Sequence, residues 1–222
     1  MNGFCWFFNE ALKMRWRNRS SIAQPLFFFV LLASLFPLSL PASQGALLVA
    51  MAPAVIWITA VLSILLGLDT LFAADYRDGS LEQMLLSQQP LSLMILGKVL
   101  AHWCCSGLPI CLLSPLLAYA MGLTASQITA LLLALLPGTL TVCLIGAMGA
   151  ALTLSARHGG ALIALLVLPL YIPVLIFGAG LVPDAVSLTA VLGPVYMLVA
   201  LLVLALTFVP IVISLAFRHI LD

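Results

Sequence analysis

Long apolar stretches separated by short polar segments make up most of this 222-residue chain. A helix that crosses a hydrocarbon core of roughly 30 Å needs about 20 consecutive apolar residues. Six stretches reach this length, and they lie near residues 22–40, 48–68, 93–121, 128–154, 161–181 and 188–217. They are apolar on every side rather than at alternate positions, which indicates helices and not strands of a barrel. The pattern therefore predicts an all-α, polytopic membrane protein with six transmembrane helices in a single domain, residues 1–222.

Composition supports this class, because 64% of the residues are hydrophobic and only 7% are charged. A soluble domain of this length has no use for so much apolar surface. The net charge of +1 does not suggest a nucleic-acid partner. The longest polar connection, about twenty residues, is too short to bury a core of its own. We therefore expect a non-catalytic membrane subunit without a catalytic centre or metal site.

The basic residues predict the orientation of the chain in the membrane. All eight lie before the first span, after the sixth, in alternate connections, or just inside the third span: Lys13, Arg15, Arg17, Arg19, Arg77, Lys98, Arg157 and Arg218. Cytoplasmic loops carry an excess of Lys and Arg. This distribution predicts that both termini and residues 69–92 are cytoplasmic, in a multi-pass protein of the cell inner membrane.

The first twenty residues allow two interpretations. On a helical projection the aromatic and aliphatic side chains lie on one side and the polar ones opposite, apart from Arg15, which falls on the apolar side. Residues 1–20 would then form a cytoplasmic helix in the membrane interface. The alternative is a solvated, positively charged tail. The apolar line is Phe4, Phe8, Leu12 and Trp16, and the polar line is Asn9, Lys13 and Arg17.

A compact acidic run lies between the second and third spans. It holds four of the seven acids of the chain, namely Asp69, Asp75, Asp78 and Glu82. An extension of the second span would carry Asp75 and Asp78 on one face. Gly79 can end that helix in the left-handed conformation. The spacing of Ser80 and Gln83 then predicts a capping box that starts a second, short helix.

This short helix must end before Pro90, and it has an apolar face made by Leu81, Met84 and Leu85. Two interpretations remain open from spacing alone. The helix could be the contact for a cytoplasmic ATPase, or it could be a capped interfacial linker without a partner.

Two polar residues of the third span need an explanation. Lys98 and His102 are four residues apart, on one helical face. They could bind a heme propionate or the heme iron, or they could form a polar pair that bonds to neighbouring helices. The prolines predict kinks in the third span, at Pro109 and Pro115, and a re-entrant segment near Gly178–Pro194.

Small residues in the fourth span predict close contact between helices. Gly146, Gly149 and Ala150 occupy neighbouring positions there. The cysteines give no redox motif, although a thiol-disulfide enzyme would use the adjacent Cys104 and Cys105.

The acidic run resembles the coupling segment of ABC-2-type membrane subunits, and more closely that of the heme exporter protein B family, CcmB. Other segments resemble the same family in the same order along the chain. The resembling motifs are Phe72-x-x-Asp75-x-x-Asp78-Gly-Ser-Leu-Glu-Gln83, Lys98-Val-Leu-Ala-His102-Trp103, Gly107-Leu-Pro109 and Arg157-His-Gly159-Gly160.

The resemblance implies a membrane subunit of cytochrome c maturation that works with a separate cytoplasmic ATP-binding subunit, a heme-handling membrane protein and a heme chaperone. The chain has no cofactor of its own, heme is a possible passenger, and a homodimer in the lipid membrane is expected by analogy. No phosphate-binding Gly-x-x-x-x-Gly-Lys-Ser/Thr motif is present, so ATP would bind the partner. The expected ATPase contact consists of Phe72, Asp75, Asp78, Gly79, Leu81 and Glu82, to which the short helix adds Ser80 and Leu85.

In this hypothesis the subunit transmits force and is not a dedicated heme conduit, because Lys98 and His102 are the only groups in the spans suited to heme. Alternatives are an ABC-2 exporter for another substrate and an ATP-independent secondary transporter.

Overall fold

The computed structural model describes residues 3–17, 19–68, 70–87, 89–154, 159–181 and 188–221. Over these residues the secondary structure is helical, with no strand. The helices are α1 (Gly3–Arg17), α2 (Arg19–Ser39), η1 (Ala42–Gln44), α3 (Gly45–Leu68), α4 (Ala73–Arg77), α5 (Ser80–Leu86), α6 (Leu91–Cys105), α7 (Gly107–Ala120), α8 (Ala125–Leu152), α9 (Gly159–Gly180) and α10 (Leu188–Leu221).

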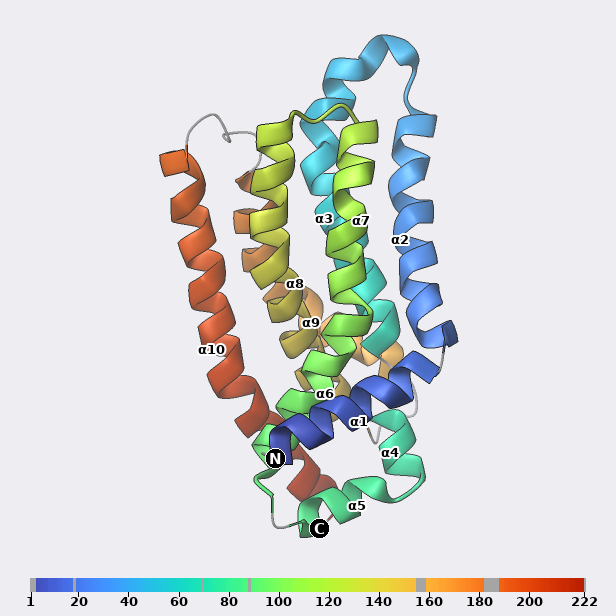
Figure 1. Ribbon diagram of the computed structural model, residues 1–222, viewed down its shortest axis with the longest axis vertical. Helices are drawn as coiled ribbons and strands as arrows, with labels where there is room; N and C mark the ends of the chain where they lie inside the picture. Colours follow the sequence, from blue (N-terminus) through green and yellow to red (C-terminus); the bar gives the residue numbers. More distant parts are fainter. Residues whose placement is uncertain are drawn as a thin grey trace.

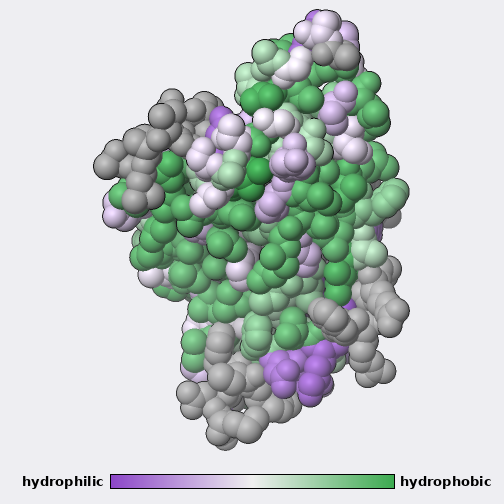
Figure 2. Space-filling view, turned by 45° about the horizontal axis from the view of Figure 1, so that its top comes forward, coloured by the Kyte–Doolittle hydropathy of each residue, from purple (hydrophilic) through white to green (hydrophobic). Residues whose placement is uncertain are grey.

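The long helices stand side by side along the long axis of the molecule (Figure 1). Six helical segments are long and apolar enough to cross a membrane, and they correspond to α2, α3, α6 with α7, α8, α9 and α10. Helix α1 lies across one end of this bundle, with α4 and α5 close to the same end. Hydrophobic surface covers most of the bundle (Figure 2). The predicted all-α class with six transmembrane helices is confirmed.

Trp57 of α3 is the largest side chain in the buried core, with 0% of its surface exposed. Glycines on two other helices make room for its indole ring. A Cβ placed on Gly138 of α8 would come within 2.3 Å of the ring, and so would one on Gly178 of α9. These three helices therefore approach one another closely around a single flat side chain.

The predicted close contact along the fourth span is confirmed at two glycines of α8. A Cβ on Gly146 would lie 2.2 Å from Leu68 of α3, and one on Gly149 would lie 2.4 Å from Val167 of α9. Nearby, the buried Tyr171 hydroxyl donates a hydrogen bond of 3.0 Å to the Val142 carbonyl. Helix α8 therefore packs closely against α3 on one side and α9 on the other. Such close contact is expected in lipid, where the hydrophobic effect does not drive helices together.

The third span is broken rather than continuous, because α6 ends at Cys105 and α7 begins at Gly107. Pro109 explains the position of the break. A proline ring clashes with the carbonyl of the residue four positions earlier, which here is Cys105. Helix α7 continues through Pro115. The predicted interruption is confirmed near Pro109, and Pro115 does not break the helix.

The prediction of a re-entrant segment near Gly178–Pro194 is wrong over its described residues. Helix α9 runs regularly to Gly180, and α10 begins at Leu188 and passes through Pro194. Residues 182–187 lie outside the described part of the chain. Prolines are tolerated in membrane helices because neighbouring groups satisfy the backbone that they free.

We predict that Gly178→Ala destabilises the fold, because the added methyl group meets the rigid Trp57 ring. Overpacking of this kind costs about 1–3 kcal/mol. Gly180→Ala, near the end of the same helix, is the matched control, since a Cβ there meets nothing within 4 Å. Thermal unfolding of the purified protein in detergent measures both changes. Equal melting temperatures for the two variants would contradict the packing described for Trp57.

Candidate functional site

Helices α4 and α5, with the turn between them, form the candidate functional site. They lie at the end of the bundle where α1 crosses and where α10 ends (Figure 1). Helix α5 packs against both α6 and the end of α10. We call residues 72–86 the coupling segment from here on.

Gly79 fixes the turn between the two helices. Its φ of 75° is in the left-handed region, as the sequence predicted. The predicted capping box at Ser80 is wrong, because Gly79 is the N-cap of α5 and no side chain caps that helix. The first backbone N–H of α5 is satisfied by Asp78 instead, because the Asp78 Oδ1 accepts a 3.0 Å hydrogen bond from the Ser80 backbone N–H. A capping box is present at Thr124–Gln127, where α8 begins.

The inner face of the coupling segment is buried in the protein itself. Phe72 is 0% exposed, Leu81 1% and Met84 7%, while Leu85 is half-buried. The predicted apolar face of α5 is confirmed. Because Phe72 and Leu81 pack inside this chain, their side chains are not available to a soluble partner, and their contribution to any contact is to hold the segment in place.

The outer face of the coupling segment is polar with two apolar side chains. Asp78 and Glu82 are exposed. Tyr76 is 40% exposed and Leu86 86% exposed on the same segment. We call Tyr76, Asp78, Glu82 and Leu86 the outer face.

The acidic run is not a continuous extension of the second span, because α3 ends at Leu68 and α4 is a separate helix that ends at Arg77. Asp78 is the C-cap of α4 and is exposed, whereas the Asp75 side chain is 19% exposed. Hydrogen bonding from the Ser80 hydroxyl and backbone N–H lowers the pKa of Asp78. Its stabilising contribution is therefore present above the ordinary carboxyl pKa, near 4, and is lost as the pH falls through the lowered value.

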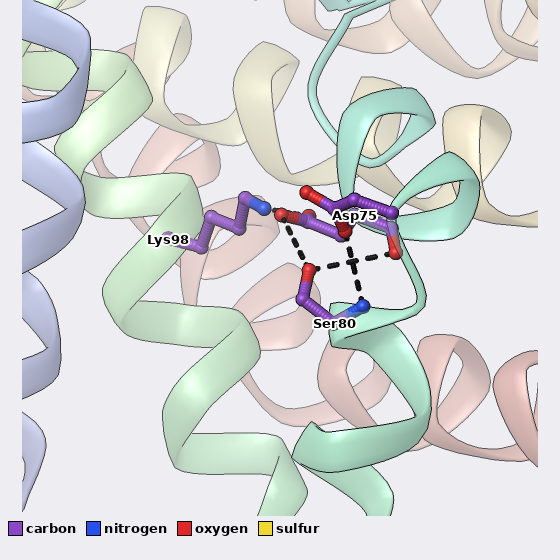
Figure 3. Close-up of polar contacts among 4 residues, drawn as sticks. Asp75, Ser80 and Lys98 are labelled. Atoms are coloured by element: carbon purple, nitrogen blue, oxygen red, sulfur yellow. Dashed lines mark hydrogen bonds and ion pairs between the residues drawn. The ribbon is translucent and has the colours of Figure 1, made fainter.

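Asp75 forms an ion pair with Lys98 of α6, in which Oδ2 of the acid faces Nζ of the lysine. Figure 3 shows the lysine extending from α6 toward the coupling segment, with Ser80 beside Asp75. The Ser80 hydroxyl donates to the Asp75 backbone carbonyl at 3.4 Å and lies 3.5 Å from Oδ1. The two charged side chains are only 15% and 19% exposed, for Lys98 and Asp75 respectively. Among the described residues this is the one salt bridge.

Aromatic side chains complete this contact. Lys98 Nζ lies 5.7 Å from the centre of the Phe72 ring, within the range of a cation–π interaction. The Phe72 ring in turn meets Phe217 of α10 edge to face, with centroids 5.1 Å apart. The coupling segment is therefore tied to α6 by charge and to α10 by ring packing.

His102 lies one turn further along α6 and is 0% exposed. Its Nε2 lies 3.3 Å from the Ser106 hydroxyl, which also donates to the His102 carbonyl at 2.8 Å. A Cβ on Gly67 would come within 3.1 Å of the imidazole, so α3 packs directly against the ring. The structure does not bring Lys98 and His102 together as a pair. Lys98 pairs with Asp75 of the coupling segment, whereas His102 contacts Ser106, the residue between α6 and α7.

Helix α1 lies along α6. Its Asn9 and Lys13 are exposed, whereas Phe8, Leu12 and Arg15 are half-buried. Burial lowers the pKa of Arg15, which as an arginine stays protonated. The predicted helix with two faces is observed in these residues, with Arg15 on the half-buried side, and its position at the membrane interface stays a prediction. The structure does not describe the side chains of Phe4, Trp16 and Arg17.

The Asp75–Lys98 pair was not predicted from the sequence. A signal for it exists, because a lysine inside a span requires a partner, and the acidic run begins just outside the neighbouring span. The contact of Phe72 with Phe217 joins residues far apart in the chain and has no comparable signal.

Comparison with known proteins gives consistent matches over almost the whole chain. The family profile described as CcmB protein matches residues 3–220. The heme exporter protein B of Pseudomonas aeruginosa is 45% identical over 214 residues, which are 96% of this chain and 95% of that protein. The protein of the same name from Haemophilus influenzae is 42% identical over 99% of both chains. That from Escherichia coli K12 is 42% identical over 97% of both.

Proposed function

The chain belongs to the CcmB family, and from that membership and the geometry of the coupling segment we propose that it is the membrane subunit of an ABC-type complex for heme export in cytochrome c maturation. In this proposal the chain carries no catalytic centre. A separate cytoplasmic subunit binds and hydrolyses ATP, and this subunit converts the hydrolysis into movement in the membrane.

The outer face of the coupling segment is the observation that carries the proposal. It presents Asp78 and Glu82, together with the exposed Tyr76 and Leu86, on a short helix pair outside the bundle. An apolar side chain that is 86% exposed beside two carboxylates is the composition of a protein contact with a charged rim. Basic residues of the ATP-binding subunit would meet the acids, and Leu86 would occupy a groove. Leu81 and Phe72 hold the segment from inside.

The orientation follows from charge at the two ends of the bundle. Lys13, Arg77 and Arg218 lie at the end that carries the coupling segment. The described residues of the opposite connections, 40–44 and 121–124, hold no charged side chain. By the positive-inside rule this distribution supports a cytoplasmic position for the coupling segment and both termini, in a chain that we propose lies in the inner membrane.

Heme would not be bound by His102 in this proposal. The imidazole is fully buried, it faces Ser106, and Gly67 packs against it. Lys98, the other candidate for contact with heme, forms an ion pair with Asp75. Heme would then leave through a partner or at an interface, with the heme-handling membrane protein and the heme chaperone as the other members of the complex. No cofactor would reside in this chain.

Apolar side chains on α9 and α10 offer the contact surface for those partners, for lipid and for a second copy. On α10 they include Tyr196, Phe208 and Leu215, which are each more than 60% exposed. Membrane subunits of ABC complexes usually work in pairs, so we propose a homodimer within the assembly.

We predict that reversing the two outer acids, in the variant Asp78→Lys with Glu82→Lys, weakens association with the ATP-binding subunit by about tenfold or more, because each new lysine would repel the partner's basic residues. Co-purification through a tag on this chain measures the loss. Glu10→Lys on α1 is the control, since it adds positive charge at an exposed acid of the same end. Full recovery of the ATPase with the double variant would contradict the docking surface.

Reporter fusions test the orientation. A reporter that is active only in the cytoplasm should be active when fused after Gln83 and inactive when fused after Gly122, because these positions lie at opposite ends of the bundle. A reporter that is active only outside the membrane should give the reverse pattern. Activity of the outside reporter after Gln83 would overturn the proposed topology.

Heme titration tests the proposal for His102. His102→Leu should leave heme binding by the purified complex within about twofold of the unaltered level, because the imidazole is 0% exposed and packed against α3, where a heme does not reach it. The absorption spectrum of the complex measures bound heme. A lost or shifted heme absorption band in this variant would make His102 a ligand and assign heme a path through the third span.

A further inference from the structure

The structure divides the acids of the coupling segment into two sets that differ in exposure. Asp78 and Glu82 are exposed on the outer face, whereas Asp75 is turned toward α6 and is 19% exposed. Only the outer acids are available to a soluble partner. Asp75 therefore needs a different explanation from its neighbours.

We propose that the Asp75–Lys98 ion pair is the contact through which movement of the coupling segment reaches the third span. The inference rests on the proposed function, since it assumes that an ATP-binding subunit moves this segment. We call these two residues the linking pair.

Three observations support this role. The linking pair joins two segments that are separated along the chain by the whole of α5 and the turn that follows it. Each member of the pair has a further contact. The Ser80 hydroxyl donates to the Asp75 backbone carbonyl, and Lys98 Nζ lies over the Phe72 ring. A charge-assisted contact in a half-buried site is stronger and more directional than apolar packing, so it resists separation when one side is moved.

The third span is also built so that such a movement can have an effect. Helix α6, which carries Lys98, ends at Cys105, and α7 begins at Gly107. Ser106, the residue between them, has φ −118° and ψ −57°. On the α6 side of the break, the Trp103 indole N–H donates to Thr139 of α8 at 3.0 Å, so the end of α6 is held against α8. Displacement of α6 by the linking pair would therefore act at a break that already separates it from α7.

The competing explanation is that Asp75 only neutralises a lysine in an apolar environment. The two explanations differ for a variant that removes both charges. Replacing a buried ion pair by apolar residues is often neutral for stability, whereas removing one partner leaves an uncompensated charge. The decisive variant is therefore Asp75→Leu with Lys98→Met, the apolar double variant. Its control is Glu10→Leu with Lys13→Met on α1, which likewise removes one acid and one base at the same end of the bundle, both of them exposed.

The experiment uses the full complex in a strain that lacks its own copy of this chain. Three quantities are measured for each variant: recovery of the ATP-binding subunit with tagged chain, ATP hydrolysis by the purified complex, and the amount of heme-stained c-type cytochrome in the membranes. We expect the apolar double variant to keep the ATPase and its hydrolysis rate within about twofold, while cytochrome c falls about tenfold or more, the size of a typical coupling between sites. The α1 control should match the unaltered chain in all three.

A normal amount of cytochrome c with the apolar double variant would overturn the inference and reduce the linking pair to charge neutralisation. If that variant does not accumulate in the membrane, the neutral pair Asp75→Asn with Lys98→Gln decides. It should lower cytochrome c with the ATPase still bound, because a neutral hydrogen bond is about half as strong as a charge-assisted one. Full cytochrome c with this pair would equally overturn the inference.

Failure of the proposed function would look different. In that case the unaltered chain itself would recover no ATP-binding subunit, or deletion of the chain would leave c-type cytochromes unchanged. Either result is obtained without any change to the linking pair.

Discussion

Close packing of three helices around Trp57 is the constraint on which the rest of this structure depends. In a membrane, apolar side chains gain nothing by leaving lipid for one another, so helices associate through close contact and hydrogen bonds. Gly138 and Gly178 allow α8 and α9 to approach the flat indole of α3, and Gly146 and Gly149 continue the contact along α8. This arrangement produces a rigid group of helices. Helices α4 and α5 lie outside this group, whereas α6 is joined to it by the hydrogen bond of Trp103 to Thr139 of α8 and by the contact of His102 with Gly67 of α3.

The second constraint is the cost of charge in an apolar environment. Lys98 lies on a membrane-spanning helix, and its ammonium group is stabilised by the Asp75 carboxylate and the face of Phe72. Satisfying that one charge fixes the direction of Asp75, and with it the orientation of α4. The remaining acids, Asp78 and Glu82, are exposed. The need to neutralise Lys98 therefore accounts for the buried acid of the segment, and the exposed acids are the ones for which we propose a partner.

The coupling segment also shows why local sequence signals have limits. Gly79 was predicted to be left-handed and is, because its φ depends only on its own backbone. The capping box expected at Ser80 did not form. Asp78 lies near enough to bond the Ser80 N–H first, and Gly79 takes the N-cap position. The hydrogen bond between Asp78 and Ser80, on either side of Gly79, decided this, and spacing alone could not. The same holds for Pro109 and Pro115, of which only the first interrupts a helix.

The sequence by itself determined the class of the protein, the number of spans, the position of the coupling segment and the family, because these depend on hydrophobic length, charge distribution and motifs that are local in the chain. It also indicated close packing at Gly146 and Gly149. Only the tertiary structure decided which side chains of the coupling segment point inward. Asp75 meets Lys98 and Phe72 meets Phe217 because α6 and the end of α10 pass beside the segment. Such contacts depend on how helices distant in the chain pack together, and no periodicity within one helix records that.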